Sequence, residues 1–190
     1  MIIVCISKCD APGGRREKAI SERAQARRKL FEVLSERFGL EPKEILKAES
    51  GKPYFADWSY PAFSISHTDG AVAVVVSDEN PSVGIDIEKF SERLRNTKLT
   101  DRFFPSLSVG ENEISDITFV LDEGAELLEA GGEPVLIFTL GEAVVKCNGG
   151  GFSVSSAAAA LSSGMKKSTY VVRMGEDKYA LSVAVVKKES

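Results

Sequence analysis

Two carboxylates stand two residues apart in Ser82–Glu88, which reads Ser-Val-Gly-Ile-Asp-Ile-Glu. Side chains two apart on a strand lie on the same face, so Asp86 and Glu88 project together and Gly84 leaves space beside them. Carboxylates this close repel each other, and a divalent cation or a Lys or Arg side chain relieves the repulsion; oxygen ligands suit Mg2+. Taken alone, the same pattern is also typical of an amphipathic edge strand with a solvated acidic face.

Two further side chains that could contact an anion precede these carboxylates. His67, the single histidine, lies between Ser66 and Thr68 near a strand end, where a side chain can reach a phosphate or act as an acid or base. A lone histidine also commonly has a structural role. Upstream, the turn Gly51-Lys52-Pro53 leaves Lys52 projecting as a point charge that suits a phosphate or the adenine side of a nucleotide.

A basic helix is predicted over residues 17–38, where apolar residues recur near helical spacing and Gly39 follows as the closing residue. Residues 15–29 carry an excess of five positive charges, although the net charge of the chain is -4. Arg23 and Arg27 are four residues apart and share one face of this helix. That face either contacts a small polyanion or is a solvated basic surface.

Glu142 and Lys146 are also four residues apart, in a helix predicted over residues 139–148 and closed by Gly149. Thr139-x-x-Glu142 has the form of a capping box, and Glu142 with Lys146 is a pair that stabilises a helix by about 0.2–0.5 kcal/mol. The residues alone therefore leave open whether this pair stabilises a helix or takes part in chemistry.

Short strands and a few helices make up the rest of the predicted pattern, which belongs to the α+β class. We predict strands at residues 2–6, three strands within 63–88, and further strands at 114–121, 169–174 and 179–186. We predict additional helical segments at residues 41–46, 91–104 and 123–130. Apolar residues make up 43% of the chain, which is ample for a packed core.

Four motifs follow one another along the chain: Gly51–Pro53, Phe63–Thr68, Val83–Glu88 and Glu142–Lys146. Together they closely resemble the 4′-phosphopantetheinyl transferase superfamily, in its larger, pseudodimeric (surfactin-synthetase-activating) branch. The resemblance extends over residues 15–90 and over part of residues 138–152. It departs from the family pattern at the last motif, where Gly141 stands in place of the usual lysine.

The resemblance implies a fold of two similar α+β halves, each an antiparallel sheet plus one long helix, which together form a pseudodimer. On the sequence, the halves are residues 1–89 and residues 90–190. The active site is then expected at the interface of the two halves.

The resemblance also implies an enzyme, a transferase that moves the 4′-phosphopantetheine arm of coenzyme A onto a serine of an apo acyl, peptidyl or aryl carrier protein. Coenzyme A is then a substrate and Mg2+ the cofactor. The implied metal ligands are Asp86, Glu88 and Glu142, and the implied catalytic residues are Asp86, Glu142 and Lys146. The implied coenzyme A contacts are Arg23, Arg27, Lys52, Ser66, His67 and Lys146, with Arg23 preferred over Arg27.

Other classes of function fit these residues less well. The main alternative is a catalytically degenerate coenzyme A-binding protein of the same fold. A Ser-His-Asp hydrolase is disfavoured, because Ser66, His67 and Asp69 are neighbours in one turn and no nucleophile elbow surrounds a serine. No apolar run approaches the roughly 18 residues of a membrane span, and three cysteines cannot form a disulfide framework. We therefore expect a cytoplasmic monomer that binds neither membrane nor nucleic acid.

Overall fold

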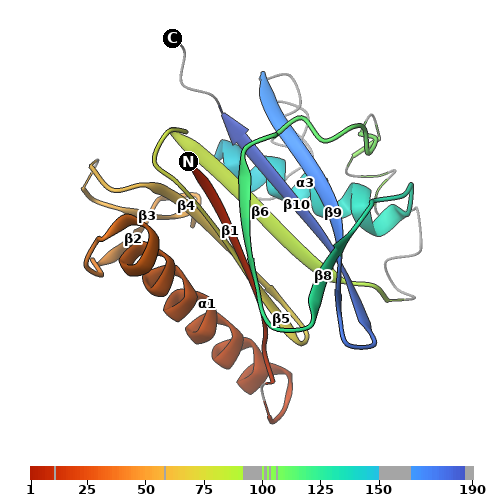
Figure 1. The fold of residues 1–190 in the computed structure, drawn as a ribbon, viewed down its shortest axis with the longest axis horizontal. Coiled ribbons are helices and arrows are strands. Elements are labelled where there is room, and N and C mark those ends of the chain that lie inside the picture. Colours follow the sequence, from red (N-terminus) through yellow and green to blue (C-terminus); the bar gives the residue numbers. More distant parts are fainter. Residues whose placement is uncertain are drawn as a thin grey trace.

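The computed structural model describes residues 1–10, 12–57, 59–91, 100, 102, 104–105, 107–149 and 164–186. Its helices are α1 (Arg15–Phe38) and α3 (Pro134–Asn148). Its strands are β1 (Ile2–Lys8), β2 (Ile45–Lys47), β3 (Pro53–Phe55), β4 (Ala62–Thr68), β5 (Ala71–Ser77), β6 (Ser82–Lys89), β7 (Ile117–Leu121), β8 (Ala125–Leu128), β9 (Met165–Met174) and β10 (Asp177–Val186). The arrangement, shown in Figure 1, confirms the predicted α+β class.

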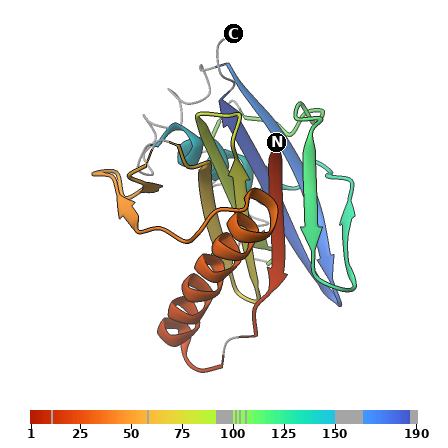
Figure 2. The ribbon, with the colours of Figure 1, turned by 60° about the vertical axis from the view of Figure 1, so that its left-hand side comes forward.

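The described strands form two four-stranded sheets and one small hairpin. The first sheet has the order β4-β5-β1-β7 and the second sheet the order β6-β10-β9-β8, while β2 pairs with β3. Neighbouring strands are antiparallel except β1 and β7, which run parallel. Figure 2 shows the β2–β3 hairpin protruding from the sheets at the left, above α1.

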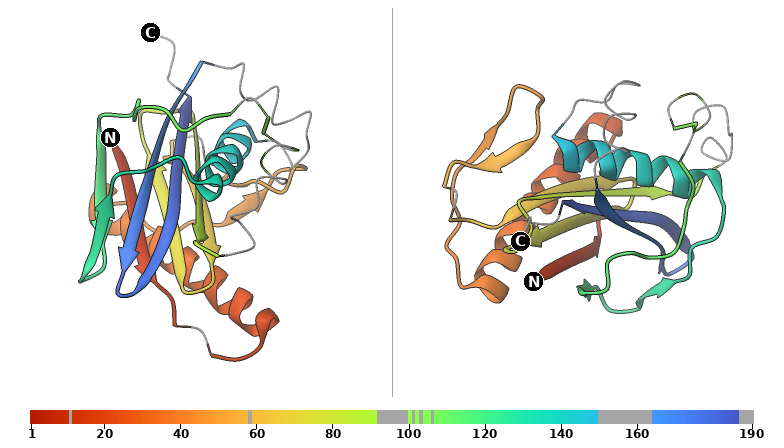
Figure 3. Two further views of the ribbon diagram at one scale, coloured as in Figure 1. Left: turned by 90° about the vertical axis from the view of Figure 1, so that its right-hand side faces the viewer. Right: turned by 90° about the horizontal axis from the view of Figure 1, so that it is seen from above.

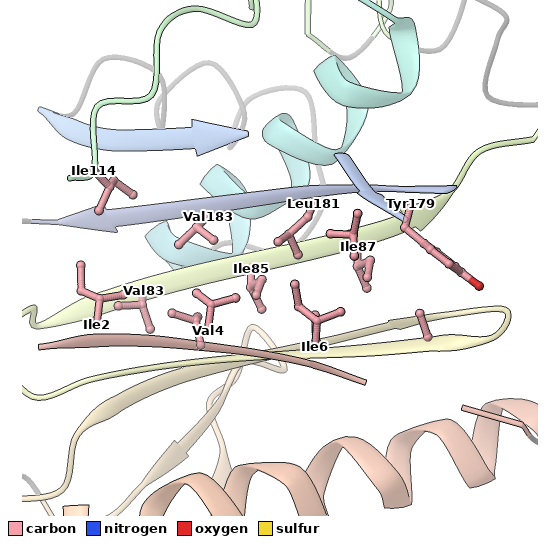
Figure 4. Close-up of a cluster of buried hydrophobic side chains, with 14 of the residues drawn as sticks. Ile2, Val4, Ile6, Val83, Ile85, Ile87, Ile114, Tyr179, Leu181 and Val183 are labelled. Atoms are coloured by element: carbon pink, nitrogen blue, oxygen red, sulfur yellow. The ribbon is translucent and has the colours of Figure 1, made fainter. Parts of the chain in front are cut away.

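The two sheets pack face to face around the largest hydrophobic core. Because side chains alternate along a strand, every second residue of β1, β6 and β10 points into the space between the sheets. These residues are Ile2, Val4 and Ile6 of β1, Val83, Ile85 and Ile87 of β6, and Tyr179, Leu181 and Val183 of β10. Figure 4 shows them in one layer, with α3 above the second sheet and α1 below the first.

Each sheet has its outer face covered by one helix. Helix α1 packs Leu30, Val33 and Leu34 against the first sheet, and these positions follow helical spacing. Helix α3 packs Leu136 and Val144 against the second sheet and runs along β6 and β10 (Figure 3). Of the helices in the described ranges, none is long and apolar enough to cross a membrane.

Strands β4 and β6 are edge strands of different sheets, and hydroxyl groups join them. One edge of β6 has N–H groups with no partner in its own sheet, and such groups require acceptors when they are buried. The N–H groups of Ile85, Ile87 and Lys89 donate to the hydroxyls of Ser64, Ser66 and Thr68 at 3.3, 3.4 and 3.4 Å. This seam of serine and threonine side chains places Ser66 beside Asp86.

Helix α3 crosses β6 at very close range at Gly84. A Cβ atom on Gly84 would lie 2.1 Å from the carbonyl oxygen of Ala143 and 2.4 Å from the backbone nitrogen of Cys147. The open space that the sequence predicted beside Asp86 is therefore filled by the backbone of α3, and that prediction was wrong. The close approach brings the last turns of α3 directly onto β6.

We expect Gly84→Ala to lower the free energy of unfolding by about 3 kcal/mol, because the added methyl group meets backbone atoms that cannot rotate away. Urea denaturation measures the loss. The matched control is Gly132→Ala, where a Cβ atom meets nothing within 4 Å, and we expect a change within about 0.5 kcal/mol there. A Gly84→Ala protein as stable as the wild type would contradict the close packing of α3 on β6.

Most predicted elements are confirmed, and a few are wrong. The structure contains the strands predicted at residues 2–6, 63–88, 169–174 and 179–186 and the helix predicted at residues 17–38. It has no helix at residues 41–46, and residues 123–130 contain β8 instead of a helix. Residues 114–121 contain the shorter strand β7. The helix predicted at residues 91–104 lies mostly outside the described residues.

The predicted halves, residues 1–89 and 90–190, exchange strands in the structure. Strand β6 precedes the division and pairs with β10 after it, whereas β7 follows the division and pairs with β1. Each sheet therefore contains strands from both halves. The halves as domains, and their relation as a pseudodimer, stay predictions.

Candidate active site

A cavity of about 770 Å³ lies where α1, the β2–β3 hairpin, the β4–β6 seam and α3 meet. Eight of the nine predicted site residues line it: Arg23, Arg27, Ser66, His67, Asp86, Glu88, Glu142 and Lys146. Apart from Lys47, the remaining lining is apolar, from Ile20, Ala24, Ile45, Pro53 and Ile65. The cavity therefore combines a charged part, drawn from segments far apart in the sequence, with an apolar wall.

Asp86 is the buried anion of this cavity. The residue is 2% exposed, and its Oδ1 atom accepts hydrogen bonds from Lys146 Nζ at 2.5 Å and from Ser66 Oγ at 2.8 Å. Lys146 Nζ also donates to Ser66 Oγ at 3.0 Å. Buried charges require such partners. Lys146 therefore forms an ion pair with a residue of β6. Stabilisation of its own helix alone does not account for these contacts.

Three carboxylates surround the single ammonium group of Lys146 and perturb each other. Burial and the charge of Asp86 raise the pKa of Glu142 to about 7, although Lys146 acts in the opposite direction. Burial by itself lowers the pKa of Lys146, but the charges of Asp86 and Glu142 outweigh it, so this pKa is raised. This cluster of three carboxylates and one ammonium group thus has an excess of negative charge that favours the binding of protons or of a cation.

The donor set suits a hard cation such as Mg2+. Asp86 Oδ2 is buried and has no hydrogen-bond partner among the residues that the structure describes, and carboxylate oxygens are the ligands that Mg2+ prefers. In this arrangement, however, Lys146 supplies the positive charge at Asp86. Within the described residues, no group of three or more His, Cys, Asp or Glu side chains is gathered closely enough to hold a metal ion. The metal ligands Asp86, Glu88 and Glu142 therefore stay predictions.

The raised pKa of Glu142 predicts how stability depends on pH. A carboxyl group with a raised pKa in the folded state binds its proton more tightly there, so it contributes stability below its ordinary pKa of 4.5, and this contribution is lost as the pH rises to about 7. In the absence of divalent cations, we expect the wild type to lose unfolding free energy relative to Glu142→Gln as the pH rises from 4.5 through about 7, and the difference to become constant only well above pH 7. Urea denaturation across this range checks it, and a pH-independent difference would contradict the raised pKa.

Helix α1 and β4 supply a linked set of polar side chains on the basic side of the cavity. His67 Nδ1 lies 2.9 Å from Glu22 Oε2, and Arg23 Nε donates to His67 Nε2 at 3.4 Å. Glu22 is 5% exposed. Glu22 was not among the predicted site residues, although its helical spacing to the buried Ala26 and Leu30 was a signal that it faces inward.

Lys52 is the predicted site residue that does not line the cavity. Its Nζ atom donates to Ser82 Oγ at 2.8 Å and to the carbonyl oxygen of Cys147 at 3.0 Å. Cys147 belongs to the last turn of α3, where carbonyl groups attract cations. Burial lowers the pKa of Lys52. In the structure Lys52 thus stabilises the end of α3, and its contact with a nucleotide stays a prediction.

The start of α3 differs from its prediction. The helix begins at Pro134, and Thr139 lies inside it, where its Oγ1 atom donates to the carbonyl oxygen of Val135 at 2.7 Å. The predicted capping box at Thr139 was therefore wrong. Gly141 is also internal to the helix, and a Cβ atom there would lie 2.4 Å from the ring of Phe104. The glycine at this position thus makes room for an aromatic ring.

Comparison with curated proteins finds a relative of this chain. The chain is similar to the 4′-phosphopantetheinyl transferase AcpT of Escherichia coli O157:H7, with 34% identity over 138 residues, or 73% of this chain and 60% of the relative. The chain thus spans less than two thirds of the length of the curated relative that it matches. No family model matches the chain.

Proposed function

Because the chain belongs to the 4′-phosphopantetheinyl transferase superfamily, we propose that it transfers the 4′-phosphopantetheine arm of coenzyme A to a serine of an apo carrier protein. The observation that carries this proposal is the single cavity shared by the arginines of α1 and the carboxylates of β6 and α3. A site for a pyrophosphate needs both cations for its charge and acidic groups that bind a metal or accept a proton. We include the larger, pseudodimeric branch, the monomeric state and the cytoplasmic location in this proposal.

In the proposed reaction the serine oxygen attacks the phosphorus atom next to the pantetheine arm. A bond forms between this phosphorus and the serine oxygen, the bond to the bridging oxygen of the pyrophosphate breaks, and adenosine 3′,5′-bisphosphate leaves with that electron pair. The serine proton passes to a base. Most of the barrier comes from bringing the hydroxyl to a negatively charged group, so positioning and charge neutralisation dominate catalysis.

The acidic side chains would hold Mg2+ and accept the proton. Asp86, Glu88 and Glu142 would bind Mg2+, which when bound supplies positive charge for the pyrophosphate. Glu142, in the same cavity, would accept the serine proton as a carboxylate. Lys146 Nζ, beside Asp86, would neutralise charge on the leaving phosphate.

The basic side of the cavity would hold the nucleotide. Arg23 and Arg27 project from the exposed face of α1, where guanidinium groups can form charge-assisted hydrogen bonds with phosphates. Ser66 lies at the seam between the sheets, and His67 lies on the opposite face of β4 toward α1. A contact between Lys52 and the nucleotide would require Lys52 to leave its partners at the end of α3.

The test is to incubate the protein with coenzyme A, Mg2+ and a panel of apo acyl, peptidyl and aryl carrier proteins. Mass spectrometry should show one carrier protein that gains a phosphopantetheine group on a serine, together with release of adenosine 3′,5′-bisphosphate. Tight binding of coenzyme A without product for any carrier protein would favour the alternative, a catalytically degenerate coenzyme A-binding protein. The direct ion pair between Lys146 and Asp86 favours that alternative, because the ammonium group of Lys146 occupies the place where a metal cation would bind Asp86.

A further inference from the structure

Thr68, at the end of β4, connects the backbone of β6 to a carboxylate of the same strand. Its Oγ1 atom accepts a hydrogen bond from the N–H of Lys89 at 3.4 Å and donates to Glu88 Oε2 at 3.1 Å. A hydroxyl group has one hydrogen and two lone pairs, so one group can serve both partners at once. An ionised carboxylate can only accept hydrogen bonds, so the hydroxyl hydrogen points to Glu88.

Glu88 lines the cavity of the candidate active site, whereas Thr68 does not. Burial and the charge of Asp86 raise the pKa of Glu142, and the charge of Glu88 acts in the same direction. The carboxylate of Glu88 therefore lies close enough to the other acidic groups of the cavity to interact with them. Thr68 contacts this carboxylate from outside the cavity, and from the other sheet.

The contact favours one orientation of the Glu88 side chain. Glutamate has three rotatable side-chain bonds, and their freedom is lost when the carboxylate binds a cation. Threonine is branched at Cβ, which restricts its first side-chain torsion, and the hydrogen bond from Lys89 fixes Oγ1 further. A donor held in this way orients the Glu88 carboxylate before a ligand arrives, and such preorganisation increases affinity.

We propose that Thr68 is a positioning residue that acts through Glu88, and that its hydroxyl holds this carboxylate toward the proposed Mg2+ site. This inference rests on the proposed function, because Glu88 is a proposed metal ligand. The hydroxyl of Thr68 then has two roles: it satisfies an N–H group at the edge of β6, and it orients a carboxylate of the cavity.

Ser64, on the same strand, provides a matched control for the first of these roles. Its Oγ atom accepts from the N–H of Ile85 at 3.3 Å, so its removal breaks the same kind of bond between the sheets. The residue before Ile85 is Gly84, which has no side chain to orient. A loss that comes from a weakened seam is therefore expected at both positions, whereas a loss that depends on Glu88 is expected for Thr68 alone.

The contact itself is tested by urea denaturation of the metal-free protein. Thr68→Val keeps the branched shape and removes the hydroxyl, and Glu88→Met removes the acceptor. We expect Thr68→Val to lower the urea midpoint, and to lower it clearly less when Glu88→Met is already present. Ser64→Ala should lower the midpoint by the same amount with and without Glu88→Met. Equal shifts for Thr68→Val in the two backgrounds would overturn the proposal.

The role toward a cation is tested by electron paramagnetic resonance of Mn2+ bound in the presence of coenzyme A. We expect Thr68→Val to weaken Mn2+ binding by about tenfold, and Thr68→Ser, which keeps a hydroxyl, to retain most of the wild-type affinity. Ser64→Ala should bind as the wild type does, and Thr68→Val should cause almost no further loss in the Glu88→Met background.

Wild-type affinity for Mn2+ in Thr68→Val, or equal losses in Thr68→Ser and Thr68→Val, would overturn the proposal. Absence of both Mn2+ and coenzyme A binding by the wild type would instead overturn the proposed function, and with it the role toward a cation. The urea result on the free protein does not depend on that function, so the two failures can be told apart.

Discussion

An Asp86→Asn variant is expected to lose transfer activity by a factor of about a hundred or more while it remains folded. Asparagine keeps the volume of Asp86 and an oxygen that can accept from Lys146 Nζ and Ser66 Oγ. It removes the negative charge that the proposed Mg2+ site requires. Alanine is a poorer test, because Asp86 is buried and alanine would leave Lys146 without its partner. Turnover with coenzyme A and a carrier protein, and thermal unfolding of the same preparation, measure the two effects.

The control for charge alone is Asp116→Asn, since Asp116 is exposed and accepts a hydrogen bond from Ser115. We expect this variant to have wild-type turnover. Chelation of divalent ions should abolish wild-type activity, and added Mg2+ or Mn2+ should restore it. Full activity of Asp86→Asn would remove Asp86 from the site.

Lys146→Met is expected to impair both stability and turnover. Removal of one partner of a buried ion pair leaves the other charge uncompensated, and we expect a loss of about 3 kcal/mol of unfolding free energy. This lies at the low end of the usual range because the Lys146 side chain is 32% exposed while that of Asp86 is 3% exposed. Turnover should fall by about a hundredfold or more, because the ammonium group proposed to face the leaving phosphate is lost.

A double variant separates pairing from chemistry. Asp86→Asn combined with Lys146→Met removes both charges, so we expect its unfolding free energy to exceed that of Lys146→Met alone, while its turnover stays low. Lys178→Met, at an exposed position of β10, is the control for loss of a lysine. If Lys146→Met matched the wild type in both stability and turnover, neither the ion pair nor the proposed role of Lys146 could be maintained.

Local pattern predicted the elements whose side chains follow one clear period. The β-branched run of β5 and the alternation in β6 and β10 belong to strands with a buried face, and α1 shows helical spacing with a glycine at its end. The helix predicted at residues 123–130 was wrong. The helix preference of Ala-Glu-Leu-Leu is overridden because this segment pairs with β9, where Leu127 lies opposite Val172. The start of α3 was misplaced although Pro134 stands at a first-turn position that proline favours.

Site residues that belong to sequence motifs could be predicted, whereas the positions of residues that depend on long-range packing could not. The carboxylates and Lys146, which belong to the motifs, line one cavity together with Arg23 of α1. Lys47 lines the same cavity because it lies opposite Pro53 in a short hairpin, and no local pattern marks it. Lys52 turns to the carbonyl of Cys147, a contact between residues that are far apart in the chain. Such contacts depend on how α3 lies on β6, which the sequence pattern does not specify.

The pairing of β6 with β10 determines when the cavity can exist during protein synthesis. Asp86 stands opposite Ser182 in this pair, so β6 has no partner of its own sheet until residues 177–186 have left the ribosome. The first sheet likewise lacks β7 beside β1 until residues 117–121 are made. Contacts over such sequence separations form late and slowly. In a nascent chain that lacks β10, β6 therefore has no partner strand and its apolar face is exposed. We expect a chaperone to be most useful at this strand before the chain is released.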